Sequence, residues 1–82
     1  MKLLFFANFR EKLGTDCEQW PNLDGIETLN DLLESLRSRG EPWLSTLASD
    51  EVLAAVNQEM AALNTSIALD DEVALFPPVT GG

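Results

Sequence analysis

One leucine stripe constrains the fold of this 82-residue chain more than any other feature. The stripe follows the i, i+3, i+4, i+7 spacing of an amphipathic helix, at Leu29, Leu32, Leu33 and Leu36. Thr28 precedes it and Asp31 stands three residues later, which is a capping-box arrangement. Arg37 and Arg39 would occupy the last turn, where cations suit the helix dipole, and Gly40 would end the helix. The sequence therefore predicts one helix whose apolar face must pack on another layer.

Short apolar segments on both sides of this helix indicate strands. Before it, residues 2–8 and 15–20 read as strands, with a helical turn over residues 9–14 that Gly14 ends. After it, residues 41–49 suggest a short helix with Pro42 at its first position. Residues 51–57, 58–63 and 71–76 then read as strands, the second of them short and at an edge. The order is strand, strand, helix, strands.

Alternation assigns the strand residues to two faces. In the first strand, one face carries Leu3, Phe5 and Ala7, and the other carries Leu4 and Phe6. In the last strand, one face carries Val73 and Leu75, and the other carries Ala74 and Phe76. Both faces are apolar, so the side that faces away from the core needs a further layer or a partner.

This order predicts an α+β protein in which one main helix lies on one face of a mixed sheet. The first and last strands would be central and parallel, which is the β-grasp, or ubiquitin-like, arrangement. We expect a β-grasp domain over residues 1–76 and an extended tail over residues 77–82. The sequence shows no internal linker or repeat, and no signal peptide or membrane span is expected.

Charge and composition exclude several classes of function. The formal net charge is −9, and all five basic side chains lie in the first 39 residues. Such a surface repels nucleic acid and anionic membranes, whereas a protein partner with a basic groove would be attracted. The chain has no histidine and one cysteine, so a histidine-based hydrolytic triad is excluded and no zinc site is expected. The single cysteine fits a cytoplasmic protein.

The end of the chain, "FPPVTGG", predicts a narrow, extended tail. Pro77 and Pro78 cannot continue a ladder and favour a stiff, extended exit, so six residues could reach roughly 20 Å beyond the sheet. Gly81 and Gly82 carry no side chains and could enter a narrow channel. A terminal carboxylate is a poor electrophile until it is joined to AMP. This chain has no phosphate-binding loop, so a partner would have to use the ATP.

These residues carry a resemblance to a known family. The segments "LLFFAN", "LAAVNQE" and above all "DEVALFPPVTGG" resemble the MoaD family of small sulfur-carrier subunits of molybdopterin synthase, over the full length of the chain. The resemblance implies a ubiquitin-like fold, no catalytic side chains of its own and no bound cofactor. It also implies that a MoeB-like activating enzyme adenylates Gly82 with ATP and that a sulfur relay protein supplies the sulfur of a thiocarboxylate. That sulfur would be donated to a pyranopterin precursor of the molybdenum cofactor.

The resemblance also implies partners and site residues. A MoaE-like large subunit would receive the tail, in a heterotetramer of two large and two small subunits. Gly82 would carry the thiocarboxylate and Gly81 would let the tail fit. The remaining docking contacts would come from Phe6, Met60, Phe76, Pro77, Pro78, Val79 and Thr80. Asp70 departs from the family's pattern, which often has glycine there; aspartate tolerates left-handed turn geometry better than most residues.

Other functions remain open at this stage. The chain could be a ThiS-like sulfur carrier for thiamin thiazole synthesis, a ubiquitin-like protein modifier joined to lysines through Gly82, or an interaction module with an idle tail. Cys17 could carry a persulfide, although a small structural residue is the expected role. The acids Asp70, Asp71 and Glu72 lack the spacing of a calcium loop and are expected to form a solvated turn.

Overall fold

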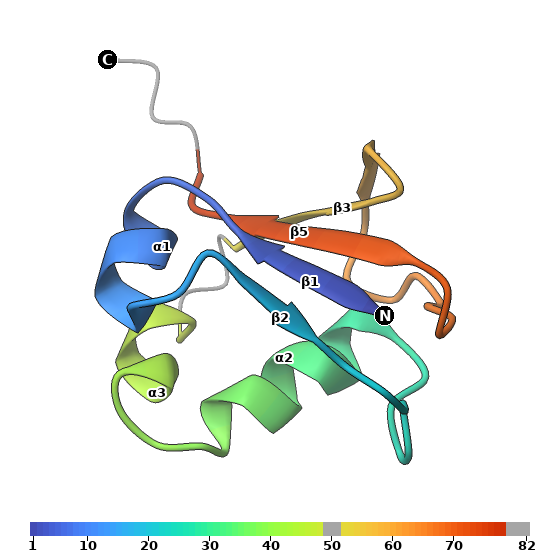
Figure 1. Ribbon diagram of the computed structural model, residues 1–82, viewed down its shortest axis with the longest axis horizontal. Coiled ribbons are helices and arrows are strands. Elements are labelled where there is room, and N and C mark those ends of the chain that lie inside the picture. The colour runs from blue at the N-terminus through green and yellow to red at the C-terminus, as the bar shows by residue number, and fades with distance from the viewer. Residues whose placement is uncertain (49–51, 79–82) are drawn as a thin grey trace.

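The computed structural model describes residues 1–48 and 52–78 (Figure 1). The strands are β1 (Lys2–Phe5), β2 (Cys17–Gln19), β3 (Leu53–Val56), β4 (Glu59–Ala61) and β5 (Glu72–Phe76). The helices are α1 (Asn8–Leu13), α2 (Leu29–Arg37) and α3 (Trp43–Thr46). Among these described residues, no helix has the length and apolar character that crossing a membrane requires.

The five strands form one mixed sheet in the order β2-β1-β5-β3-β4. The first and last strands, β1 and β5, lie side by side and parallel, as predicted. The other neighbour of β5 is the antiparallel β3, so β5 is the middle strand of the sheet. This order, with the main helix α2 lying across the sheet, confirms the predicted β-grasp fold (Figure 1).

The core lies between the sheet and its helical layer. The four leucines of α2 are fully buried, and each such burial stabilises the fold by about 2 kcal/mol. From the sheet, Leu3, Phe5, Val73 and Leu75 meet them and are almost completely buried. Phe5 also packs edge-on against Trp43, with the ring centroids 5.6 Å apart. The opposite face of the sheet carries no helix of the described chain (Figure 1).

The start of α2 agrees with the predicted capping box. The Thr28 hydroxyl accepts a hydrogen bond from the Asp31 backbone N–H at 3.2 Å. The Asp31 carboxylate accepts bonds from the backbone N–H groups of Glu27 at 3.0 Å and Thr28 at 3.2 Å. These bonds, with that of Glu27 the largest cause, lower the pKa of Asp31.

The end of α2 differs from the prediction. The helix stops at Arg37, with Ser38 as its C-cap, so Arg39 lies beyond the last turn. The backbone N–H groups of Arg39 and Gly40 reach back three residues instead of four, which tightens the chain into a 3₁₀-like turn. Gly40 has a φ of 86°, a left-handed conformation that glycine adopts without strain.

Two further local predictions were wrong. The first strand ends at Phe5, and Ala7 is exposed instead of facing the core. The chain reverses at Ala7, whose φ is 54°, and enters α1, which fills the core with Phe9 and Leu13. In the second case, Pro42 precedes the single turn of α3 as its N-cap instead of occupying its first helical position.

Candidate functional site

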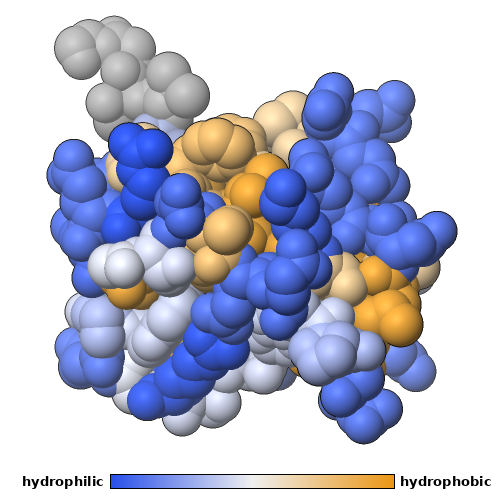
Figure 2. Space-filling model, viewed as in Figure 1, coloured by the Kyte–Doolittle hydropathy of each residue, from blue (hydrophilic) through white to orange (hydrophobic). Residues whose placement is uncertain are grey.

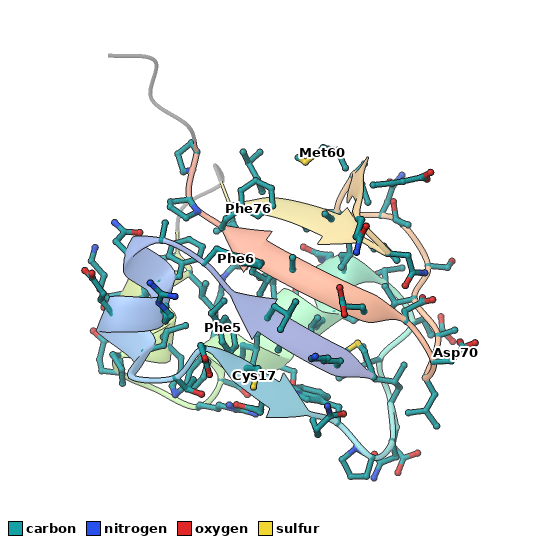
Figure 3. All side chains as sticks on the ribbon, turned by 45° about the horizontal axis from the view of Figure 1, so that its top comes forward. Phe5, Phe6, Cys17, Met60, Asp70 and Phe76 are labelled. Atoms are coloured by element: carbon teal, nitrogen blue, oxygen red, sulfur yellow. The ribbon has the colours of Figure 1, made fainter. Side chains whose placement is uncertain are left out.

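The outer face of the sheet carries an exposed apolar surface at the end where β5 finishes. Phe6 is 46% exposed and Met60 is 62% exposed, whereas Phe76 is half-buried. Figure 2 shows hydrophobic residues gathered between hydrophilic ones on this part of the molecule. Figure 3 places Phe6 and Phe76 close together, with Met60 further along the same surface. We call Phe6, Met60 and Phe76, with the smaller side chains between them, the outer apolar face.

The strand register explains why these residues from distant parts of the chain come together. Phe5 pairs with Leu75, and the Phe6 N–H donates to the Leu75 carbonyl at 3.1 Å, so Phe6 lies beside Phe76. Leu53 pairs with Phe76 on its other side. Phe6 and Phe76 therefore face away from the core, as alternation predicted. Their predicted role in docking stays a prediction.

Met60 joins this face through a second row of side chains. Leu4 pairs with Ala74, Ala74 with Ala55, and Ala55 with Met60. Directly paired residues point to the same side of a sheet, so this row crosses four strands on the outer face. No local pattern indicated a role for Met60, because its three-residue strand is too short to show alternation. Only the resemblance to a known family had singled it out.

Residues 77 and 78, with which the predicted tail begins, follow the middle strand of the sheet. β5 is paired on both sides, by β1 and β3, and Pro77 and Pro78 follow it directly and are half-buried. Proline has no backbone N–H, so the ladder ends there. The predicted site residues Val79, Thr80, Gly81 and Gly82 lie outside the described residues. The structure therefore holds Pro77 and Pro78, the start of the predicted tail, next to the outer apolar face.

The acidic segment before β5 is an ordered turn. The Asp71 carboxylate accepts bonds from the Ala68 backbone N–H at 2.8 Å and from the Asn57 side-chain amide at 3.0 Å. Asp70 is exposed, and its φ is not positive, so no glycine is needed at its position. In the described part of the chain, no three side chains of histidine, cysteine or acidic type are grouped to hold a metal ion.

Cys17 lies at the edge of the sheet, in β2, and is exposed. It pairs with Leu4, which places it at the far end of the row that leads to Met60 (Figure 3). Its position in a strand agrees with the prediction, and its expected structural role stays a prediction.

Sequence reasoning missed one polar cluster on the helical side. Arg39 donates to both carboxylate oxygens of Glu18, at 2.6 and 3.0 Å. Its guanidinium also lies 4.6 Å from the ring centroid of Trp43 and 5.6 Å from that of Trp20, whose indole N–H donates to Glu18 at 2.9 Å. The partners are 21 residues apart, so no local pattern could have indicated the contact. The cluster ties β2 to the turn after α2.

The fold and this site define a class of protein: a small ubiquitin-like β-grasp domain that presents an apolar sheet face beside a C-terminal tail. The sequence comparisons give the family. The chain belongs to the ThiS family, whose sequence profile matches residues 3–82. This confirms the resemblance that the tail and strand motifs indicated.

Curated relatives match over the whole length. The molybdopterin synthase sulfur carrier subunits of Haemophilus influenzae and Escherichia coli are each 38% identical to this chain over 82 residues, covering 100% of it and 99% of the relative. Small archaeal modifier protein 1 of Haloferax volcanii is 33% identical over 88 residues, covering 100% of both chains.

Solved structures agree on the fold. The crystal structure of SAMP1 from Haloferax volcanii has a TM-score of 0.77 and 34% identity, and covers 100% of this chain and 98% of that one. The complex of subunits 1 and 2 of molybdopterin-converting factor from Helicobacter pylori contains a chain with a TM-score of 0.60 and 23% identity, covering 99% and 96%. At that identity the likeness concerns the fold alone.

Proposed function

We propose that this chain is the sulfur-carrier subunit of a molybdopterin synthase. One observation carries the proposal: two relatives of that name are each 38% identical to this chain over its whole length. The structure is suited to the role, because the middle strand β5 anchors the tail and an exposed apolar face lies beside its base.

The chemistry of the carrier requires only the terminal carboxylate of this chain. An activating enzyme would join the Gly82 carboxylate to AMP, releasing pyrophosphate from ATP. A sulfur nucleophile delivered by a relay protein would then displace AMP and leave a thiocarboxylate. Transfer of that sulfur to a pyranopterin precursor, with water supplying oxygen, would restore the carboxylate. The chain acts as a donor and holds no cofactor in this scheme.

The outer apolar face gives the proposal its partner surface. The large subunit of the synthase would cover Phe6, Met60 and Phe76 and receive Pro77–Gly82 in its active site, in an assembly of two large and two small subunits. Burying such a cluster is the usual way in which an apolar sheet face becomes an interface. The proposal places the chain in the cytoplasm, where an exposed thiol such as that of Cys17 stays reduced.

The intact mass of the protein, isolated from its own cells without alkylation, tests the proposal directly. We expect a species heavier by the difference between one sulfur and one oxygen, with the change mapped to Gly82. Loss of molybdoenzyme activity on deletion of the gene, with thiamin independence retained, would separate this pathway from thiazole synthesis. A wholly unmodified mass while molybdenum cofactor is being made would contradict the proposal.

Similarity to small archaeal modifier proteins favours a second function, the modification of other proteins through Gly82. The same acyl-adenylate would serve both uses, with a lysine amine as the nucleophile in place of sulfur. Mass spectrometry of lysine-linked adducts carrying the end of this tail would establish it. Their absence from cells that make the thiocarboxylate would leave the carrier function alone.

A further inference from the structure

The sheet has an open edge next to the outer apolar face. β4 is the last strand in the order β2-β1-β5-β3-β4, so on one of its sides the described residues 1–48 and 52–78 provide no neighbouring strand. An open edge presents unpaired backbone groups that can bind another extended chain. β4 contains three residues, Glu59, Met60 and Ala61, and the question is which of them point outward.

The hairpin geometry answers this question. Asn57 and Gln58 both have positive φ, 52° and 71°, and join β3 to β4 as the two central residues of a type I′ turn. The residues that flank such a turn, Val56 and Glu59, exchange backbone hydrogen bonds. Because bonded and non-bonded pairs alternate along an antiparallel ladder, the next pair, Ala55 and Met60, is not bonded across the hairpin.

The other side of β3 confirms this assignment independently. The Asn57 N–H donates to the Glu72 carbonyl of β5 at 2.8 Å. Residue 57 therefore faces β5, as does residue 55, while residues 54 and 56 face β4. The backbone N–H and C=O of Met60 consequently point to the open edge. Within the described residues, neither group has a partner outside the ladders.

A groove runs beside this edge. It has a volume of about 380 Å³, and its lining includes Val56, Glu59, Met60, Ala61 and Thr65. Met60 thus lines the groove, carries a side chain that is 62% exposed, and contributes two free backbone groups to the edge. This combination supplies both the hydrogen bonds and the apolar contact that strand addition uses.

The charge of the groove indicates which kind of chain can bind there. Glu59 is the charged residue among the described groove residues, and the sequence has no basic side chain beyond Arg39. A second copy of this chain, with a net charge of −9, would be repelled. An extended segment with a lysine or arginine opposite Glu59 would be attracted, since cross-strand pairs of opposite charge are favourable.

We infer that β4 is a second docking element, at which an extended segment of the large subunit, carrying a basic residue for Glu59, adds to the sheet by hydrogen bonding to the Met60 backbone. The inference rests on the proposed function for the identity of the partner. It extends the interface from the outer apolar face around the edge of the sheet.

The backbone contact is tested by binding of the purified large subunit to Met60→Pro and Met60→Ala. Both variants lose the methionine side chain, but only proline removes the outward N–H, and proline is tolerated where an edge-strand N–H faces solvent. We expect Met60→Pro to bind about tenfold more weakly than Met60→Ala. Equal affinities would overturn the inference. If the proline variant unfolds, replacing the Met60 amide by an ester deletes the same N–H without a ring.

The charge contact is tested by Glu59→Lys, with Glu34→Lys as the matched control. Both side chains are exposed and both changes alter the net charge equally, but Glu34 lies on the solvent side of α2. We expect Glu59→Lys to weaken binding about tenfold and to flatten its salt dependence, and Glu34→Lys to do neither. If the two substitutions weaken binding equally, only the net charge of the chain matters and the inference is overturned.

Two controls keep this inference distinct from the proposed function. If the unaltered chain does not bind the large subunit at all, the proposed function fails, whatever β4 does. If it binds and the β4 variants bind equally well, only the present inference fails. Sedimentation of the free chain gives the remaining outcome: a dimer that Met60→Pro dissociates would assign the edge to a second copy of this chain and overturn the inference.

Discussion

Arg39 binds both carboxylate oxygens of Glu18, and the two residues join the edge strand β2 to the turn after α2. The bidentate geometry, with Trp43 and Trp20 beside the guanidinium, is one that lysine cannot reproduce. The hydrogen bond from Arg39 is the largest cause of a lowered pKa for Glu18. The same pair raises the pKa of Arg39, chiefly through its bond to Glu18. The lowered pKa of Glu18 and the raised pKa of Arg39 are two effects of the same favourable contact.

Glu18→Gln is therefore expected to destabilise the protein at neutral pH. Because the pair is partly exposed, the loss should be below about 1 kcal/mol. A lowered folded-state pKa means that the stabilisation is present above the ordinary glutamate pKa of about 4.3 and is lost as the pH falls through the folded value. Urea unfolding at pH 7 and at successively lower pH should show the gap between the two proteins closing below about pH 4. A gap that stays constant would mean that the charge is irrelevant.

The hairpin turn is expected to contain removable strain. Gln58 has a φ of 71°, a conformation that favours glycine, and its side chain is exposed. Gln58→Gly should raise the free energy of unfolding by about 0.5–1 kcal/mol. Asn57→Gly is the control in the same turn. Asn57 donates to Asp71 and accepts from the Glu72 N–H, so glycine there should give no gain. Stabilisation by both variants, or by neither, would contradict this account of the turn.

The capping box of α2, which was predicted from residues only three positions apart, can be tested by substitution. Thr28→Ala removes the acceptor for the Asp31 N–H and should cost about 1 kcal/mol of unfolding free energy. Thr28→Ser, which keeps the hydroxyl, should retain most of it. Chemical denaturation of the two variants measures the difference, and an alanine variant as stable as the serine variant would show that the cap is unimportant here.

Some features of the fold and of the candidate site were predicted from the sequence and others were missed, for physical reasons. The cap, the stripe of α2 and the parallel pairing of β1 with β5 follow from spacing and from the order of elements, and all were predicted. The reversal at Ala7 was missed, because a small residue with positive φ leaves no mark on the apolar pattern. The contact of Arg39 with Glu18 and the position of Met60 depend on which distant segments the fold brings together. Such contacts follow only from the assembled sheet.

The outer apolar face gives a prediction about docking. Phe76→Asp should weaken binding of the large subunit by about 2 kcal/mol or more, because a carboxylate would be buried there without a partner. Leu69→Asp is a matched control, since Leu69 is 51% exposed but precedes the acidic turn, at the end of β5 remote from the tail. Titration calorimetry with both variants compares them directly. Equal binding by the Phe76 variant and the unaltered chain would remove this residue from the interface.

The tail yields the prediction closest to the chemistry. Adding one alanine after Gly82 should abolish thiocarboxylate formation, because the proposed adenylation needs a free carboxylate on the last glycine. The unfolding free energy should stay the same, since the last buried core residue of the described chain is Leu75, in β5. Gly81→Ala tests a different requirement, the narrow fit of the tail, and should raise the KM for sulfur transfer while leaving the terminal carboxylate available. Mass spectrometry of the activated chain separates the two effects: an extended chain that still gains sulfur at residue 82 would refute the mechanism, whereas loss of sulfur in both variants would place the narrow fit in the activation step itself.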